Sequence, residues 1–103
     1  MDIELETEIR NDEKVKETLL NPGKYKVIML NDNQTPMDFV VEILINIFRH
    51  SKEVAEKITM EIHNDGQAAV GVYTYEIAEQ KTVEATKLSR VNGFPLQVAI
   101  EKE

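Results

Sequence analysis

The chain has 103 residues, a formal net charge of −7 and no cysteine. A domain of this size can bury a core without cross-links, and the lack of cysteine excludes disulfides, iron–sulfur clusters, thiolate zinc sites and cysteine nucleophiles. A net acidic chain without a basic cluster binds nucleic acid and anionic membranes poorly, so we expect protein partners. No apolar run approaches the roughly 20 residues that span a bilayer, and the N-terminus is acidic where a signal peptide is basic, so we expect a cytoplasmic protein.

The first 23 residues differ in composition from the rest of the chain. They contain seven acidic and three basic side chains, a short apolar run at Val15, Leu19 and Leu20, and an Asn-Pro-Gly ending. Such a segment has too few apolar residues to form a core of its own. We therefore predict a flexible acidic N-terminal extension over residues 1–23 and a core domain over residues 24–103.

Three helices are predicted from capping residues and apolar spacing. The first has Thr35 as its N-cap and Pro36 at its first helical position, and it carries an apolar stripe at Phe39, Val40, Ile43, Leu44, Ile47 and Phe48. The second begins after Ser51 and ends at Gly66, with an apolar stripe at Val54, Ala55, Ile58 and Ile62. The third begins after Thr74 and ends at an Asn-Gly pair, and its stripe comprises Ile77, Ala78, Ala85 and Leu88.

Three strands alternate with these helices along the chain. The first covers residues 24–30, and an Asn-Asp-Asn-Gln turn follows it. The second covers residues 67–73, with Ala68, Val70 and Val72 predicted on one face, and the third carries Leu96, Val98 and Ile100. The order β-α-α-β-α-β predicts an α+β fold, a two-layer sandwich with a three-stranded antiparallel sheet and three helices.

Few side chains in this sequence are suited to catalysis or metal binding. The two histidines, His50 and His63, are separated by a helix and form no chelating pair, and no nucleophile or phosphate-binding motif is present. We therefore predict a binding module without cofactor or metal rather than an enzyme. The polar pair Asn31 and Asp32 stands out at the end of the first strand, although a turn and a helix cap explain it equally well from the residues alone.

One longer pattern resembles a known family. Residues 25–40 are YKVIMLNDNQTPMDFV, and the pattern continues with Ile62-His63, with Gly66, with GVYT at 71–74 and with Pro95-Leu96. This combination resembles the ClpS family over essentially all of residues 24–103. Members of that family are adaptors that deliver N-degron substrates to a Clp-type AAA+ unfoldase.

The resemblance implies three groups of site residues. The clamp for a substrate α-amino group would be Asn31, Asp32 and His63. The pocket for its hydrophobic side chain would be lined by Ile28, Leu30, Thr35, Met37, Val40, Thr59, Ile62 and Leu96. The surface that docks on the N-terminal domain of a ClpA- or ClpC-type unfoldase would include Glu76, Glu79 and Lys81.

These residue types suit the capture of a free N-terminus. An ammonium group has three donors and one charge, which a carboxylate, an amide oxygen and a neutral imidazole can satisfy together. We expect Leu, Phe, Tyr and Trp as first residues, with Met37 as an adaptable gate. Acidification should weaken binding, because a protonated imidazole at His63 repels an ammonium.

Position 59 departs from the family pattern, which usually has a bulky methionine one turn before the histidine. Thr59 is smaller, and Met60 beside it is predicted to point away from the pocket. We therefore expect a roomier pocket floor that also tolerates Ile or Val, unless a neighbouring side chain refills the space.

Two other functions are compatible with parts of the sequence. The element order also resembles the C-terminal domain of the ribosomal stalk protein, which docks translation factors and needs no clamp. An acid–base enzyme could use Asp32 and His63, but no third polar group accompanies that pair. The combination of Asn31, Asp32 and His63 favours the adaptor.

Overall fold

The computed structural model describes residues 24–103, so the predicted extension over residues 1–23 lies outside the described residues. Three strands and three helices follow one another in the predicted order. Their bounds are β1 Tyr25–Leu30, α2 Met37–Asn46, α3 Lys52–Asp65, β2 Gln67–Tyr73, α4 Tyr75–Val91 and β3 Gln97–Lys102. Within this part of the chain, no helix has the length and apolar character needed to cross a membrane.

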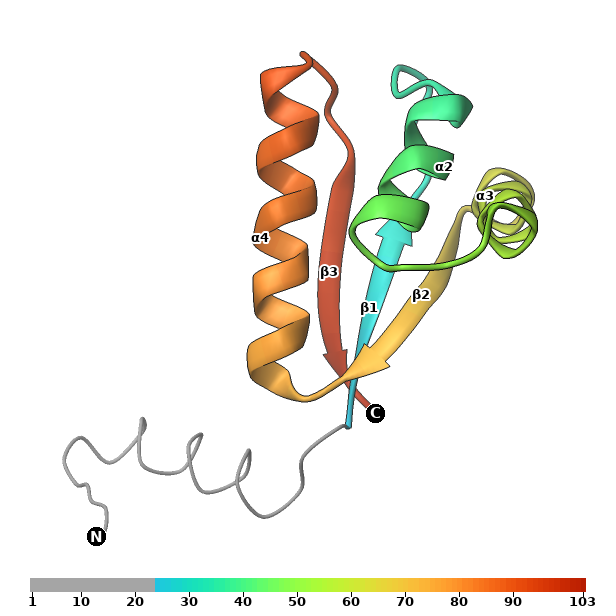
Figure 1. Cartoon of the computed structure of the whole chain (residues 1–103). Coiled ribbons are helices and arrows are strands. Elements are labelled where there is room, and N and C mark those ends of the chain that lie inside the picture. The colour runs from blue at the N-terminus through green and yellow to red at the C-terminus, as the bar shows by residue number, and fades with distance from the viewer. Residues whose placement is uncertain (1–23) are drawn as a thin grey trace, which may run out of the picture.

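The strands form one antiparallel sheet in the order β2-β1-β3, and the three helices lie over one of its faces (Figure 1). Alternation along β1 directs Tyr25, Val27 and Met29 into the layer between sheet and helices, where all three are buried. They form one core there with helix residues that include Val40, Ile43, Leu44, Ala55, Ile62, Ala78 and Ala85. The predicted two-layer α+β fold is confirmed.

A β-bulge in β2 changes which side chains face the helices. Val27 of β1 pairs with Gly71, whereas the next residue pairs with Ala69, so Val70 is the extra residue. Beyond the bulge the alternation is reversed: Val72 is 45% exposed, while Tyr73 packs against the core. The prediction that Val72 shares a face with Val70 is therefore wrong.

Capping was predicted correctly at α3 and α4. The Ser51 hydroxyl accepts a hydrogen bond from Val54 N at 3.2 Å, and the Thr74 hydroxyl accepts one from Ile77 N at 3.4 Å. Gly66 ends α3 in the left-handed region with φ 90°, a conformation that glycine adopts without a Cβ penalty. These ends fix where the last turn of α3 lies relative to the sheet.

The predicted cap of α2 is wrong. Pro36 occupies the N-cap position and no side chain caps the helix. Thr35 instead donates its hydroxyl to Asp32 Oδ2 at 2.8 Å. The helix begins one residue later than predicted: the Pro36 carbonyl accepts hydrogen bonds from Phe39 N and Val40 N at 3.1 and 3.2 Å, so Thr35 lies one residue before the N-cap position.

Three apolar residues of the predicted stripes lie at the surface. Val54, Ile77 and Leu88 are 41%, 41% and 42% exposed. On the buried faces of the same helices lie Thr59 and Ser89, whose hydroxyls each donate to the backbone carbonyl four residues earlier at 2.8 Å. The helix backbone accepts a hydrogen bond from each hydroxyl, so neither is left unpaired in the apolar layer.

Candidate functional site

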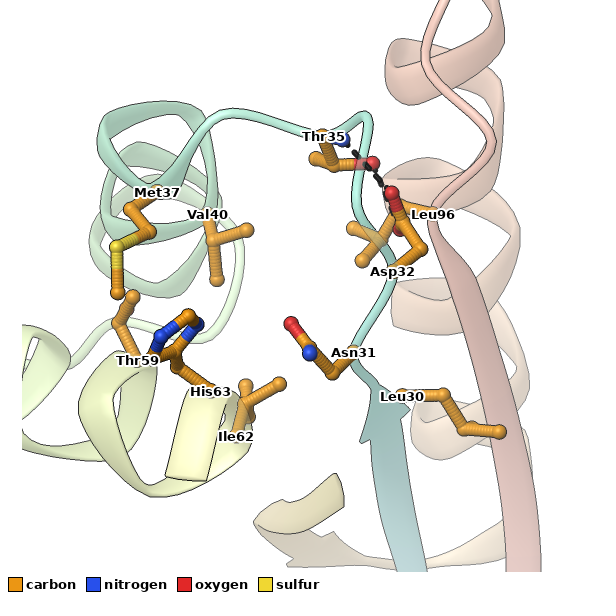
Figure 2. A pocket seen from close by; sticks show the side chains of 10 residues that line it. All are labelled: Leu30, Asn31, Asp32, Thr35, Met37, Val40, Thr59, Ile62, His63 and Leu96. Carbon is orange, nitrogen blue, oxygen red and sulfur yellow. Dashed lines mark hydrogen bonds between the residues drawn. The ribbon is translucent and has the colours of Figure 1, made fainter. Parts of the chain in front are cut away.

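A hollow of about 270 Å³, part of it open to solvent, lies at the end of β1. Four segments surround it: the end of β1 with the turn that follows, the first turn of α2, the last two turns of α3, and the residue before β3 (Figure 2). Its ten lining residues are Leu30, Asn31, Asp32, Thr35, Met37, Val40, Thr59, Ile62, His63 and Leu96. The lining combines an apolar interior with polar side chains.

One backbone hydrogen bond sets the polar side of the site. The Asn31 N–H donates to the Gly66 carbonyl at 2.9 Å, next to the last β1–β2 pair. This bond ties the residue after β1 to the C-terminal end of α3, so that the Asn31 side chain points toward the side chain of His63 (Figure 2). Both side chains are exposed.

Within residues 24–103, neither the Asn31 amide nor the His63 imidazole has a hydrogen-bond partner. A histidine in the last turn of a helix often bonds the free backbone carbonyls there, and His63 does not. Two polar side chains at the mouth of an apolar hollow are therefore free to bind a ligand.

Asp32 differs from them because its own loop occupies its carboxylate. Oδ1 accepts hydrogen bonds from Gln34 N at 2.8 Å and Thr35 N at 2.7 Å, and Oδ2 accepts the Thr35 hydroxyl. Burial raises the pKa of Asp32, but these hydrogen bonds and the charge of Arg90 outweigh burial, so the pKa lies below its ordinary value. A carboxylate has about four acceptor positions, so one remains open beside a full negative charge.

The interior of the hollow is apolar and well buried. Val40, Ile62 and Leu96 are 6%, 3% and 1% exposed, whereas Met37 at the rim is 40% exposed. Thr59 is 4% exposed and donates its hydroxyl within α3, so it adds no unpaired polar atom to the cavity wall. Such an apolar lining favours a hydrophobic side chain as the guest.

Of the residues predicted for the clamp and the pocket, only Ile28 is absent from the lining. It lies between Ala69 and Ala99 in the middle of the sheet, outside the core cluster and on the face opposite Val27 and Met29. The hollow lies at the end of β1 instead, where Leu30 reaches it. Ile28 lies two residues before the end of β1, so it is farther from the hollow than Leu30, which lines it.

The three predicted docking residues lie on α4, away from this hollow. Glu76 and Glu79 are exposed. Lys81 is half-buried: its Nζ donates to the Ile47 carbonyl at 2.6 Å and lies 5.4 Å from the centroid of the Tyr73 ring. Lys81 thus binds the C-terminal end of α2, a contact that sequence analysis did not anticipate.

Sequence analysis also missed Arg90, in the last turn of α4. Its guanidinium donates to the carbonyls of Phe94 and Leu96, at 3.0 and 2.8 Å. A basic residue in a last helical turn commonly bonds nearby carbonyls, but the sequence alone does not say which ones. Here one of them belongs to a residue that lines the hollow.

Among residues 24–103, no group of histidine and acidic side chains could hold a metal ion. Fold and site together define a small α+β binding module, with an apolar pocket whose mouth carries free polar groups. The protein-family model described as "ATP-dependent Clp protease adaptor protein ClpS" matches residues 21–99. The chain belongs to the ClpS family of Clp protease adaptors, a family of adaptor proteins and not of enzymes.

Relatives with this description match along most of their length. The ClpS adapter protein of Treponema denticola is 43% identical over 97% of this chain and 99% of its own. That of Maricaulis maris is 44% identical over 87% of this chain and 83% of its own. A solved structure described as Agrobacterium tumefaciens ClpS2 bound to L-phenylalaninamide has a TM-score of 0.77 and 42% identity, covering 81% of this chain and all of the other. The stalk-protein and enzyme alternatives are thereby set aside.

Proposed function

We propose that this adaptor binds proteins through a free N-terminal residue that is bulky and hydrophobic, and delivers them to a Clp-type AAA+ unfoldase. The observation that carries the proposal is the free Asn31 and His63 side chains at the mouth of one apolar hollow. The ligand of the Agrobacterium relative supports it, because L-phenylalaninamide carries a free α-amino group next to a benzyl side chain.

The α-amino group is assigned to the polar side of the hollow. The Asn31 amide oxygen and a ring nitrogen of neutral His63 accept hydrogen bonds from the ammonium, and Asp32 supplies the negative charge and its remaining acceptor position. Each charge-assisted hydrogen bond contributes roughly 1.5–3 kcal/mol. Acetylation removes the charge and adds bulk, so a blocked terminus should be rejected.

The first side chain is assigned to the apolar interior. Burying a Leu or Phe side chain contributes about 1.5–3 kcal/mol, comparable with one bond of the amine clamp. Neither half of the site gives tight binding alone, so selectivity requires both the free amine and the side chain. The exposed Met37 at the rim can adjust to Leu, Phe, Tyr or Trp, since methionine is flexible and polarizable.

Delivery is assigned to α4. Glu76 and Glu79 are exposed there and could contact the N-terminal domain of a ClpA- or ClpC-type partner in the cytoplasm. Lys81 belongs to the same predicted surface, but its ammonium also holds α2. Residues 1–23, the predicted flexible arm, would engage the unfoldase during transfer.

Fluorescence anisotropy with two labelled peptides tests the capture step. One begins with unblocked Phe and the other is its N-acetylated twin. Binding of the free peptide alone supports the proposal, and Asn31→Ala and His63→Ala should then each weaken it. Equal binding of both peptides, or of neither, would refute recognition of the N-terminus.

A further inference from the structure

The segment that joins α4 to β3 forms one wall of the hollow. Leu96 is its last residue before β3, and its side chain is 1% exposed while lining the pocket. Gly93 has a left-handed φ of 80°, so this segment reverses direction sharply after α4. The position of Leu96 therefore depends both on its packing in the core and on how the turn before it is held against the helix.

Side-chain and backbone contacts hold this turn at different points. Phe94 N donates to the Ser89 carbonyl at 2.9 Å, and the Phe94 ring packs edge-on against Phe39 of α2 at 4.8 Å between centroids. Neither contact reaches Leu96. The Arg90 guanidinium does so, because the nitrogen that donates to the Phe94 carbonyl also donates to the Leu96 carbonyl.

We infer that Arg90 is a positioning residue for the substrate pocket: by holding the Leu96 carbonyl it fixes the pocket wall that selects the first side chain of the substrate. This inference rests on the function proposed above and names a residue that determines its specificity. Arg90 touches no part of the substrate itself. Its guanidinium suits the task because the planar group holds the two N–H bonds of one nitrogen in fixed directions, whereas a lysine ammonium is a point donor on a flexible stem.

A second contribution of Arg90 is electrostatic. Burial raises the pKa of Asp32, and the hydrogen bonds of the turn, with the charge of Arg90 as the smallest contribution, lower it below its ordinary value. Lysine at this position would retain the charge but lose the fixed pair of hydrogen bonds to the Phe94 and Leu96 carbonyls. The two contributions can therefore be separated by comparing Arg90→Lys with Arg90→Met.

The test measures side-chain discrimination in the full chain. Kd is determined by anisotropy competition at pH 7 for peptides that begin with free Phe or free Ala and are otherwise identical. Arg90→Met should reduce the Ala-to-Phe ratio of Kd about tenfold, which corresponds to roughly 1.4 kcal/mol. Arg90→Lys should reduce the Ala-to-Phe ratio of Kd nearly as much. Lys87→Met removes a charge on the exposed side of α4 and is the matched control, so it should not change that ratio.

A structural role alone would lower the folded fraction and weaken all peptides equally, leaving the ratio unchanged. That result in folded Arg90→Met would overturn the inference. A double-mutant cycle with Leu96→Val adds a second criterion, since Arg90→Met should have a smaller effect on the ratio when the wall is already altered. Failure of the wild-type chain to distinguish free from acetylated Phe would instead refute the proposed function, so the two failures are distinguishable.

Discussion

Replacing Thr59 by methionine should narrow the range of accepted N-terminal residues. Thr59 lines the hollow, is 4% exposed and turns its hydroxyl back to the Ala55 carbonyl at 2.8 Å. Methionine would extend an unbranched chain from the same point into a space of about 270 Å³. We expect its added volume to oppose guests that are branched at Cβ more than unbranched ones.

The expected magnitude follows from the cost of overfilling a packed site, about 1–3 kcal/mol. We expect the ratio of Kd for an Ile-starting peptide to that for a Leu-starting peptide to rise about tenfold in Thr59→Met. Anisotropy titrations with the two peptides measure this ratio directly. Thr59→Val, which keeps the shape but loses the hydroxyl, and Met60→Thr, at a neighbouring position 47% exposed, should leave it unchanged. An unchanged ratio in Thr59→Met would show that Thr59 does not set the pocket size.

Three further outcomes are expected. Asp32→Ala should lower the free energy of unfolding by about 1–2 kcal/mol at neutral pH, as for the loss of a capping side chain. Because the folded pKa of Asp32 is depressed, this stabilisation is present above the unfolded pKa and is lost as the pH falls through the folded pKa, so urea melts of the two proteins should converge at acidic pH. Lys81→Met should lower the melting temperature by several degrees, because the Ile47 carbonyl loses its hydrogen-bond donor. Glu76→Gln, by contrast, should weaken unfoldase binding without lowering the melting temperature. His63→Ala should weaken binding of a peptide with a free N-terminal Phe in anisotropy titrations, because the ammonium loses one hydrogen-bond acceptor.

Most of the fold could be predicted because its signals are local. Ser51, Thr74 and Gly66 mark the helix ends through residues at most four positions away, and alternation in β1 accounts for the burial of Val27 and Met29 against the helices with Ile28 on the opposite face. Periodicity and capping depend on near neighbours in sequence, so they survive without knowledge of the tertiary structure. The ten pocket residues that the hollow brings together came from a family resemblance and not from such patterns.

The errors arise where the outcome depends on residues distant in sequence or on two partners in competition. The bulge at Val70 is defined by pairing with β1, which lies more than 40 residues earlier. Lys81 finds the Ile47 carbonyl 34 residues away, and no feature of the sequence around α4 specifies that acceptor. At Thr35, the Asp32 carboxylate binds both the N–H and the hydroxyl, and the N-cap position of α2 falls on the next residue, Pro36.

Asn31 and Asp32 are adjacent in sequence yet have different tasks, and the backbone explains why. The Asn31 N–H is bound across to Gly66, which fixes its Cα while leaving the side-chain amide free at the mouth of the pocket. The Asp32 carboxylate closes the following turn and brings the first turn of α2 into place. Loss of binding in Asp32→Ala would therefore combine a missing charge with a displaced Met37 and Val40, both of which follow that turn. Loss in Asn31→Ala has no such structural component, so Asn31 is the sharper probe of contact with the amine.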